Sequence, residues 1–283
     1  MKVVDTISRM NTLIKILKKE GKSIGLVPTM GYLHEGHLSL ARSAKKHTDV
    51  VVMSIFVNPI QFGPKEDFRK YPRNLKHDEA LAASAGVDVI FTPSANEMYP
   101  AGYSTYVNVE GMTETLCGAS RPGHFKGVTT VVAKLFEIVR PDIAYFGQKD
   151  AQQAMVIKRM AGDLNMGLEI KVMPIVREFD GLAMSSRNAY LSLSERKDAI
   201  VLCASLMMAK DMAKSGEKNP GKIMKAMKKL IGGVKSARIE YISAVDPATM
   251  KEIKTISGEV LFALAVFIGK TRLIDNIVVK GTK

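Results

Sequence analysis

The chain has 283 residues, of which 46% are hydrophobic and 24% charged, a composition typical of a globular protein with one or two domains. Its 41 basic residues exceed its 28 acidic residues by 13, a surplus that could favour nucleic acid. Many lysines, however, are spread along helical patterns such as 207–235, and the chain has no Trp and only 6% aromatic residues. We therefore expect no nucleic-acid partner, and an attraction for small polyanions such as ATP instead.

Hydropathy and cysteine content indicate the compartment. No apolar run approaches the roughly 18 residues of a membrane span, and the N-terminal stretch MKVVDTISRMNTLIKILKKE has a charged helical pattern without a signal-peptide core. The two cysteines, Cys117 and Cys203, make no disulfide framework, and no CxxC pair indicates zinc. We expect a cytoplasmic protein without a membrane partner.

Short apolar runs alternate with helical patterns through residue 176. Predicted strands rich in Val and Ile lie at 24–27, 50–57, 87–91, 143–146 and 170–176. Predicted helices lie between them at 36–47, 76–85, 124–139 and 150–163. Apolar strands separated by helices predict an α/β fold, a Rossmann-like doubly wound parallel sheet that binds ligands beyond the carboxyl ends of its strands.

The pattern changes after residue 176. Two helical stretches, 194–215 and 219–231, precede predicted strands at 239–245, 260–268 and 272–279. Helices followed by consecutive strands predict a smaller α+β domain with an antiparallel sheet. We therefore divide the chain into domains 1–176 and 177–283. We expect a ligand cleft between them, with the smaller domain acting as a lid hinged near residue 176.

The stretch PTMGYLHEGH, residues 28–37, follows the first predicted strand. Gly31 permits a tight turn and Gly36 opens a helix, so that His34 and His37 lie at a helix N-terminus, which suits a phosphate. Histidines in this position can donate hydrogen bonds to phosphoryl oxygens. HxxH alone favours two partly exposed turn histidines without a function, and a zinc site would need a third ligand that is not recognisable.

Three further loops carry polar residues that suit the same chemistry. They are SIFVNPIQFG with Asn58 and Gln61, IAYFGQKDAQQ with Lys149, Asp150 and Gln153, and FDGLAMSSRNAYLS with Ser185, Ser186 and Arg187. Two hydroxyls and a guanidinium would make a phosphate clamp. Each loop also has an ordinary interpretation: Asn-Pro is a turn signal, and an Asp can simply stabilise a helix N-terminus.

Two common nucleotide motifs are absent. The chain has neither GxxxxGK[ST], the phosphate loop of many NTPases, nor the dinucleotide fingerprint GxGxxG. The four polar loops together therefore favour ATP held for attack on its α-phosphate over hydride transfer or γ-phosphoryl transfer.

Six motifs occur in the order found in the pantothenate synthetase family, the pantoate–β-alanine ligases, and the chain resembles this family over nearly its whole length. The motifs are PTMGYLHEGHLSL, SIFVNPIQFG, YPRN at 71–74, RPGHFKGVTTVV at 121–132, YFGQKDAQQ and DGLAMSSRN, and the resemblance extends to GKTRLIDNI at 269–277. In the wider nucleotidyltransferase-like superfamily, HEGH is similar to the HIGH signature of class I aminoacyl-tRNA synthetases. MSSR is similar to a shortened form of their KMSKS loop.

The resemblance implies an enzyme that makes pantothenate from pantoate, β-alanine and ATP. Pantoate would attack the α-phosphate, giving enzyme-bound pantoyl adenylate and pyrophosphate, and β-alanine would then attack the activated carbonyl and release AMP. Mg²⁺ would accompany ATP, held largely by its phosphates, with Asp78 as the candidate protein ligand. The family also implies a homodimer through the N-terminal domain.

The resemblance further implies roles for individual residues. The catalytic residues would be His37, His34, Lys149, Ser185, Ser186 and Arg187. The ATP site would comprise Met30, Gly31, Tyr32, Leu33, His34, Glu35, Gly36, His37, Gly147, Gln148, Lys149, Asp150, Val176, Met184, Ser185, Ser186 and Arg187. Pantoate would bind to Gln61 and Gln153, and β-alanine to Asn58 and Gln61. Tyr32 stands where the family has a small residue, often Ala, which affects the expected packing of this loop.

Two other functions remain open from the sequence. One is a cytidylyltransferase-like enzyme, which HxGH also fits and which would leave the nucleotide on its product. The other is a nucleic-acid-binding module driven by charge, whose binding would fall steeply with salt. Release of AMP together with formation of an amide would distinguish the ligase from both.

Overall fold

The computed structural model describes residues 1–64 and 66–281, which form two compact units. The first unit consists of Met1–Glu110, Arg121–Gly147 and Val156–Pro174, and the second contains Gly111–Ser120, Gln148–Met155 and the chain from Ile175 onward. The boundary predicted at residue 176 lies beside the last crossing between the units. The segments 111–120 and 148–155 also belong to the second unit, because they pack against its small sheet.

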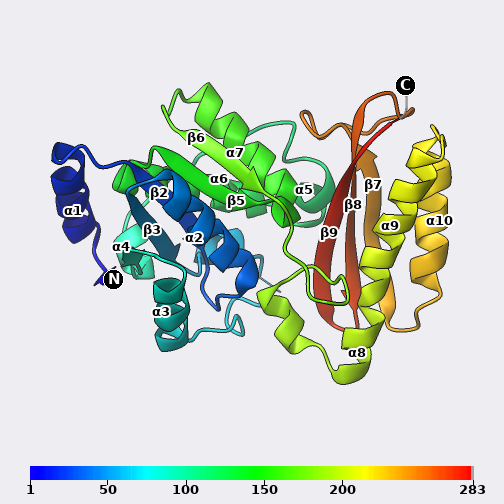
Figure 1. Cartoon of the computed structure of the whole chain (residues 1–283), viewed down its shortest axis with the longest axis horizontal. Coiled ribbons are helices and arrows are strands. Elements are labelled where there is room, and N and C mark those ends of the chain that lie inside the picture. Colours follow the sequence, from blue (N-terminus) through cyan, green and yellow to red (C-terminus); the bar gives the residue numbers. More distant parts are fainter. Residues whose placement is uncertain (65, 282–283) are drawn as a thin grey trace. The chain divides into compact units, whose positions relative to one another are not determined.

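The first unit contains a sheet of six parallel strands in the order β1-β4-β3-β2-β5-β6. Its strands β2, β3, β5 and β6 are labelled in Figure 1. The strands are β1 (Lys2–Val4), β2 (Ile24–Thr29), β3 (Val50–Ile55), β4 (Val89–Phe91), β5 (Ile143–Gly147) and β6 (Glu169–Met173). The predicted α/β class and parallel sheet are therefore confirmed, although β1 was not predicted. Strand β6 stops before Pro174, because proline has no N–H to donate to a sheet.

Helices cover this sheet and explain its continuous apolar runs. They are α1 (Ile7–Lys19), α2 (Glu35–His47), α3 (Leu75–Ser84), the short α4 (Ala95–Met98) and α6 (His124–Val139), while α7 (Ala151–Asp163) runs from the second unit into the first. A core cluster joins Leu38 and Ala44 of α2 and Ala82 of α3 to Val27 and Met53 of the sheet. Helix α6 packs against β2 and also against α1.

The second unit is built on an antiparallel sheet in the order β7-β8-β9, which confirms the predicted α+β part. Its strands are β7 (Ala237–Val245), β8 (Glu259–Ile268) and β9 (Thr271–Lys280), and its helices are α5 (Leu116–Ser120), α8 (Leu193–Asp198), α9 (Ile200–Lys214) and α10 (Pro220–Gly232). Leu206 of α9 and Met227 of α10 share a buried core with Phe262 and Leu264 of β8. The predicted helix 194–215 is two helices, separated at Ala199.

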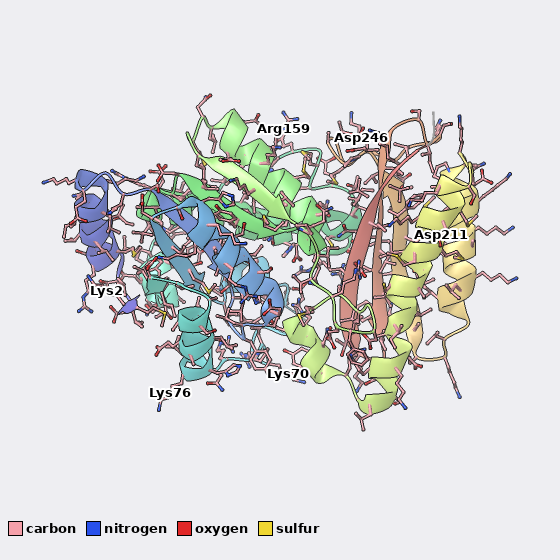
Figure 2. All side chains as sticks on the ribbon, viewed as in Figure 1. Lys2, Lys70, Lys76, Arg159, Asp211 and Asp246 are labelled. Atoms are coloured by element: carbon pink, nitrogen blue, oxygen red, sulfur yellow. The ribbon has the colours of Figure 1, made fainter. Side chains whose placement is uncertain are left out.

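The lysine-rich helices of this unit carry their charge toward solvent. In α10, Ile223, Met227 and Ile231 are fully buried, whereas Lys222, Lys225 and Lys229 are exposed. The acidic Asp211 on α9, labelled in Figure 2, is exposed as well. The positive charge therefore forms solvated helix faces, as the sequence pattern predicted. In the described ranges 1–64 and 66–281, we find no helix with the length and apolar character that a bilayer span requires.

The contact between β2 and α2 depends on the absence of a side chain at Gly25. A Cβ atom there would lie 2.6 Å from Thr48 Oγ1 and 3.2 Å from Ala44 Cβ. Gly25→Ala should therefore lower the free energy of unfolding by about 1–3 kcal/mol, because overpacking forces the helix away from the strand. Gly162→Ala is the matched control, since a Cβ at this helical position meets nothing within 4 Å.

The two substitutions should have different effects on the free energy of unfolding, and only Gly25→Ala should lower it. Gly162→Ala should leave stability unchanged or raise it by up to about 1 kcal/mol, because alanine is the better helix former. Chemical denaturation of both variants measures the difference. Equal stability of Gly25→Ala and the parent protein would mean that α2 can shift without cost.

Candidate functional site

The loop after β2 has a backbone that a buried carboxylate holds in place. Gly31 and Tyr32 both adopt left-handed conformations, with φ of 83° and 51°. Asp78 of α3 is 1% exposed, and its two carboxylate oxygens accept hydrogen bonds from Tyr32 N at 2.9 Å and Leu33 N at 2.7 Å. A Cβ at Gly31 would lie 2.9 Å from the same carboxylate, so only glycine fits there.

These contacts bear on the predicted role of Asp78 in holding Mg²⁺. Both of its oxygens already accept bonds from loop amides, and the side chain is buried. Across residues 1–64 and 66–281, no group of three or more His, Cys, Asp and Glu side chains is arranged to hold a metal ion. The two bonds give Asp78 a role in organising the loop, and its contact with Mg²⁺ stays a prediction.

His34 and His37 form the N-terminal cap of α2. His34 Nδ1 accepts from Gly36 N at 3.1 Å, and His37 Nδ1 accepts from His34 N at 3.4 Å, with the ring centroids 4.0 Å apart. A neutral imidazole whose Nδ1 accepts a hydrogen bond carries its proton on Nε2. The cap therefore sets both rings as Nε2–H donors at a helix N-terminus, where anions are favoured.

Asn58 and Gln61 lie on the short helical turn η1 (Pro59–Gln61) and form a hydrogen-bond chain with Tyr99. Asn58 Nδ2 donates to Gly127 O at 3.0 Å and to Gln61 Oε1 at 3.0 Å, and Tyr99 Oη donates to Asn58 Oδ1 at 2.8 Å. Gln61 Nε2 contacts Met30 Sδ at 3.2 Å. Burial raises the pKa of Tyr99, so its phenol stays a donor.

One backbone carbonyl determines which atoms donate and which accept along this series of hydrogen bonds. A backbone carbonyl such as Gly127 O can only accept, so the atom of Asn58 that faces it must be the amide nitrogen. That orientation turns Asn58 Oδ1 toward Tyr99 and sets Gln61 Nε2, which contacts Met30 Sδ, as the donor of the Gln61 amide. Asn58 itself is 1% exposed, and both its amide nitrogen and its amide oxygen are bonded within the protein.

The motif at 121–132, to which the sequence assigned no role, holds η1 against α6. His124 Nδ1 contacts Gln61 O at 2.9 Å, and its Nε2 lies 3.0 Å from Arg121 Nη1. A Cβ at Gly127 would lie 2.5 Å from Ile60 O and 2.6 Å from Gln61 Cα. Glycine is therefore required in the middle of this helix for the turn to approach.

In the second unit, the predicted residues after β5 form the turn η2 (Gln148–Asp150). Lys149 Nζ lies 3.8 Å from the carboxylate of Asp150. Asn276 of β9 donates from Nδ2 to both Gln148 O and Lys149 O at 2.9 Å. Downstream in α7, Gln152 is buried and binds Met112 O and Thr115 O, which gives it a structural role beside the predicted ligand Gln153.

The segment from Val176 to Arg187 also lies in the second unit. Met184 N donates to Val176 O at 3.0 Å, so these two residues of the predicted ATP site are brought together. Ser185 caps the turn η3 (Ser186–Tyr190), its Oγ accepting from Arg187 N at 3.3 Å. Arg177 forms a two-fold hydrogen-bonded ion pair with Asp275 of β9, at 2.7 and 3.0 Å.

The predicted residues thus gather in two sets, one in each unit. Met30–His37, Asn58 and Gln61 belong to the first unit, while Lys149, Asp150, Gln153 and 184–187 belong to the second. Strands β2 and β5 are neighbours in the sheet, with Leu26 opposite Ala144, so the loops that follow them start at adjacent strand ends. In parallel sheets such a position is the usual ligand site.

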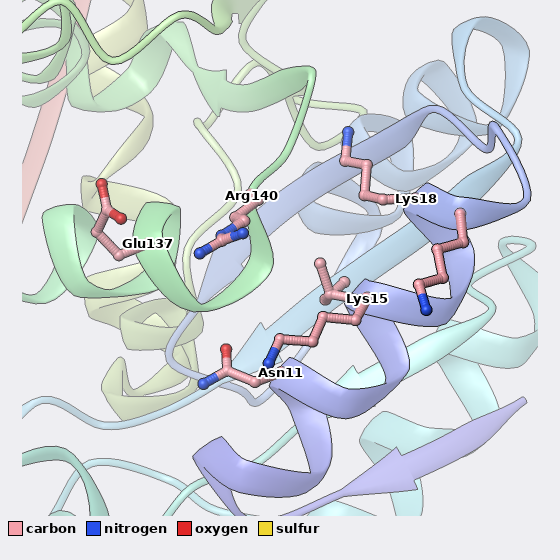
Figure 3. Close-up of a pocket in the computed structure, with 7 residues that line it drawn as sticks. Asn11, Lys15, Lys18, Glu137 and Arg140 are labelled. Atoms are coloured by element: carbon pink, nitrogen blue, oxygen red, sulfur yellow. The ribbon is translucent and has the colours of Figure 1, made fainter.

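A separate pocket of about 530 Å³ lies between α1 and the end of α6 and contains none of the predicted residues (Figure 3). Its lining includes Lys15, Lys19 and Arg140, with Glu137 among them. Lys18, which also lines it, is paired with Asp142 at 2.7 Å. These side chains offer positive charge but no nucleophile or oriented donor set, so the predicted loops remain the candidate site.

The comparisons with known proteins agree with the motifs. Residues 2–278 match the family model described as pantoate-beta-alanine ligase. The chain is 58% identical to the pantothenate synthetase of Moorella thermoacetica over 280 residues, covering 99% of each protein. It is 59% identical to that of Acetivibrio thermocellus, covering 99% of this chain and all of the relative.

Solved structures show the same relationship. The pantothenate synthetase of Thermus thermophilus superposes with a TM-score of 0.93 at 44% identity, covering 98% of this chain and 99% of the other. A pantoate–β-alanine ligase of Francisella tularensis, solved with β-γ ATP and β-alanine, has a TM-score of 0.82 at 36% identity and covers 98% and 97% of the two chains. The chain therefore belongs to the pantoate–β-alanine ligase family.

Proposed function

We propose that this protein condenses pantoate with β-alanine, using ATP and releasing AMP and pyrophosphate. Membership of the family over residues 2–278 carries this proposal. The Francisella tularensis relative, solved with an ATP ligand and β-alanine, supports two of the three substrates. The oriented donors at the helix N-terminus and on the loops support binding of a triphosphate and a hydroxy acid.

The chemistry requires two steps, because a carboxylate is a poor electrophile at neutral pH. In the first step a pantoate carboxylate oxygen bonds to the α-phosphorus and the bond to the β-phosphate oxygen breaks, releasing pyrophosphate. In the second step the amine of β-alanine bonds to the acyl carbon, loses a proton, and AMP departs with the carboxylate oxygen. The pantoyl adenylate between the steps hydrolyses readily, so water must be kept from it.

His34 and His37 are proposed to donate from Nε2 to phosphate oxygens on which charge develops in the first step. Lys149, Ser185, Ser186 and Arg187 are proposed to hold the remaining phosphates from the second unit, with Val176 and Met184 beside the adenosine. Preorganised donors of this kind need no reorientation when the charge appears. Their rate effect is therefore larger than that of flexible surface groups.

Gln61 and Gln153 are proposed to bind pantoate. The hydrogen-bond chain from Tyr99 through Asn58 sets Gln61 as a donor, which suits a carboxylate or hydroxyl oxygen of the acid. Glutamine binds the attacking carboxylate without the tight ion pair that arginine would form. For β-alanine we assign Gln61 a direct contact, and Asn58 a contact through Gln61.

Mg²⁺ is proposed to accompany ATP through the phosphates, since both carboxylate oxygens of Asp78 already bind loop amides and the described residues hold no group of three or more His, Cys, Asp and Glu side chains arranged for a metal. We also propose a homodimer. Sedimentation equilibrium should then give twice the 31.0 kDa chain mass, whereas a single chain mass at micromolar concentration would contradict it.

The phosphate assignment is tested by His37→Ala and Lys149→Ala. Each should fold normally and lose about 10²-fold or more in turnover, the scale of deleting a preorganised transition-state donor. His77→Ala and Lys158→Ala are matched controls, because both side chains are exposed and lie outside the proposed site. Turnover near the parent value in His37→Ala and Lys149→Ala, with unchanged thermal unfolding, would remove both residues from the mechanism.

The hydrogen-bond chain is tested by Tyr99→Phe. Loss of the hydroxyl leaves the buried oxygen of Asn58 without its donor, a cost of about 1–3 kcal/mol, and frees the amides to reorient. The pantoate concentration that half-saturates the first step should rise about 5- to 100-fold. Tyr103→Phe is the control, because this ring packs 5.0 Å from Tyr99 in the same aromatic cluster. If both variants showed the same dependence on pantoate concentration, the hydrogen-bond chain from Tyr99 to Gln61 would have no role in binding pantoate.

The order of the two steps is tested by exchange of labelled pyrophosphate into ATP. Exchange should require pantoate and proceed without β-alanine, and Gln153→Ala should slow it by the equivalent of about 1–3 kcal/mol. The same variant should lose less in amide formation from supplied pantoyl adenylate. An exchange that needs β-alanine would rule out a free-standing adenylation step. Equal losses in both steps would remove Gln153 from selective pantoate binding.

A further inference from the structure

Strand β9 carries two adjacent buried polar residues that the chemistry itself does not use. Asp275 is 2% exposed and Asn276 is 3% exposed. Successive side chains of a strand point to opposite faces of its sheet. Leu273 and Val279 share the face of Asp275 and belong to the core under α9 and α10, so Asn276 lies on the other face.

The side-chain amide of Asn276 makes all of its hydrogen bonds to the turn that carries Lys149. Its Nδ2 donates to Gln148 O and to Lys149 O, both at 2.9 Å, and its Oδ1 accepts from Gln148 Nε2 at 3.2 Å. The two carbonyls can only accept, so the orientation of the amide is unambiguous. One buried side chain therefore fixes two successive peptide groups of η2.

Asp275 is bonded to the segment that leads to Ser185 and Arg187. Its carboxylate accepts two bonds from the Arg177 guanidinium, at 2.7 and 3.0 Å, and one from Asn276 N at 2.7 Å. Arg177 Nη1 also donates to Gly181 O at 2.9 Å, and Arg177 pairs with Ala183 as an isolated β-bridge. The base of the loop is thus attached to the strand that holds η2.

Substitution of Asp275 and substitution of Asn276 would have different consequences. Burial raises the pKa of Asp275, and the Arg177 guanidinium opposes that shift, so removal of either partner would leave a buried group uncompensated. Asn276 is neutral, so its loss removes hydrogen bonds without leaving an unpaired charge. Asn276 is therefore the better position for a test.

We propose that β9 is a positioning element for the first step, in which Asn276 sets Lys149 and Asp275, through Arg177, sets the serine–arginine segment. Because the two residues are covalent neighbours, the strand holds both groups of phosphate ligands at a fixed separation. This inference rests on the proposed function, and it adds two positioning residues that touch no substrate. Ligands placed in advance in this way lose little by reorganisation when charge develops on the phosphates.

Loss of this positioning should slow the adenylation step selectively. Lys149 is assigned to phosphates that leave as pyrophosphate, so its misplacement should slow formation of the adenylate more than attack by β-alanine. Loss of the hydrogen-bond partners behind metal ligands typically costs about 10- to 100-fold in activity, and we expect a loss on the same scale for the support of Lys149. If Asn276 contributed only to stability, its substitution would lower the rates of both steps alike, in proportion to the folded fraction.

The test compares Asn276→Ala and Asn276→Asp with Val278→Ala, a control on the same face of β9 at a 40% exposed side chain. Pyrophosphate exchange and amide formation from supplied pantoyl adenylate are measured on each variant, with rates divided by the folded fraction from thermal unfolding. For both Asn276 variants we expect a maximal exchange rate about 10- to 100-fold lower, with amide formation within about 3-fold of the parent. Asn276→Asp should gain nothing from its similar volume, because a carboxylate cannot donate to two carbonyls.

Four results would each contradict a part of this proposal. Parent-like exchange in folded Asn276→Ala overturns the positioning role, and so does an equal loss in both steps. Recovery of exchange in Asn276→Asp overturns the hydrogen-bond argument. Absence of pantoate-dependent exchange in the parent protein instead overturns the proposed function, independently of any variant.

Discussion

The site depends on buried polar side chains that satisfy the backbone of the loops. A loop that binds an anion must present its donors outward, so its remaining N–H and C=O groups need partners from elsewhere. Asp78 supplies acceptors for Tyr32 and Leu33, and Asn276 supplies donors for Gln148 and Lys149. Each such partner comes from a segment distant in sequence. The shape of the site is therefore a tertiary property of its supports.

These supports also decide which atom each proposed ligand residue offers. Gly127 O orients Asn58, which orients Gln61, and the cap of α2 directs the ring protons of His34 and His37 to Nε2. A site whose donors are fixed before the substrate arrives stabilises developing phosphoryl charge without a further cost of reorientation. This is also why neutral side chains such as glutamine can serve an anionic nucleophile.

Much of the fold could be predicted from the sequence, because its strands and helices follow hydrophobic periodicity. The run IAYF and the pattern at 124–139 have local signals, and α6 begins and ends where predicted. The chain's family and the loops that carry His37, Lys149 and Arg187 were also readable from motifs. The assignments of single residues within those loops remain predictions.

What the sequence could not provide are hydrogen bonds between distant segments. Tyr99 has no motif that links it to Asn58, 41 residues away, and Asn276 lies 127 residues from Lys149. The family resemblance gave Asp78 as a candidate Mg²⁺ ligand, whereas its buried contacts in the structure are to backbone amides. Gly127 had a weak local signal, since an isolated glycine inside a helix often marks close packing.

The most direct measurement of the central claim is the fate of oxygen from pantoate. With both carboxylate oxygens labelled as ¹⁸O, the adenylate route transfers one of them to the phosphoryl group of AMP and leaves the other in the amide carbonyl. Mass spectrometry of the products after one turnover should find one ¹⁸O in each AMP. Unlabelled AMP, or label in inorganic phosphate or pyrophosphate, would contradict attack of pantoate on the α-phosphate.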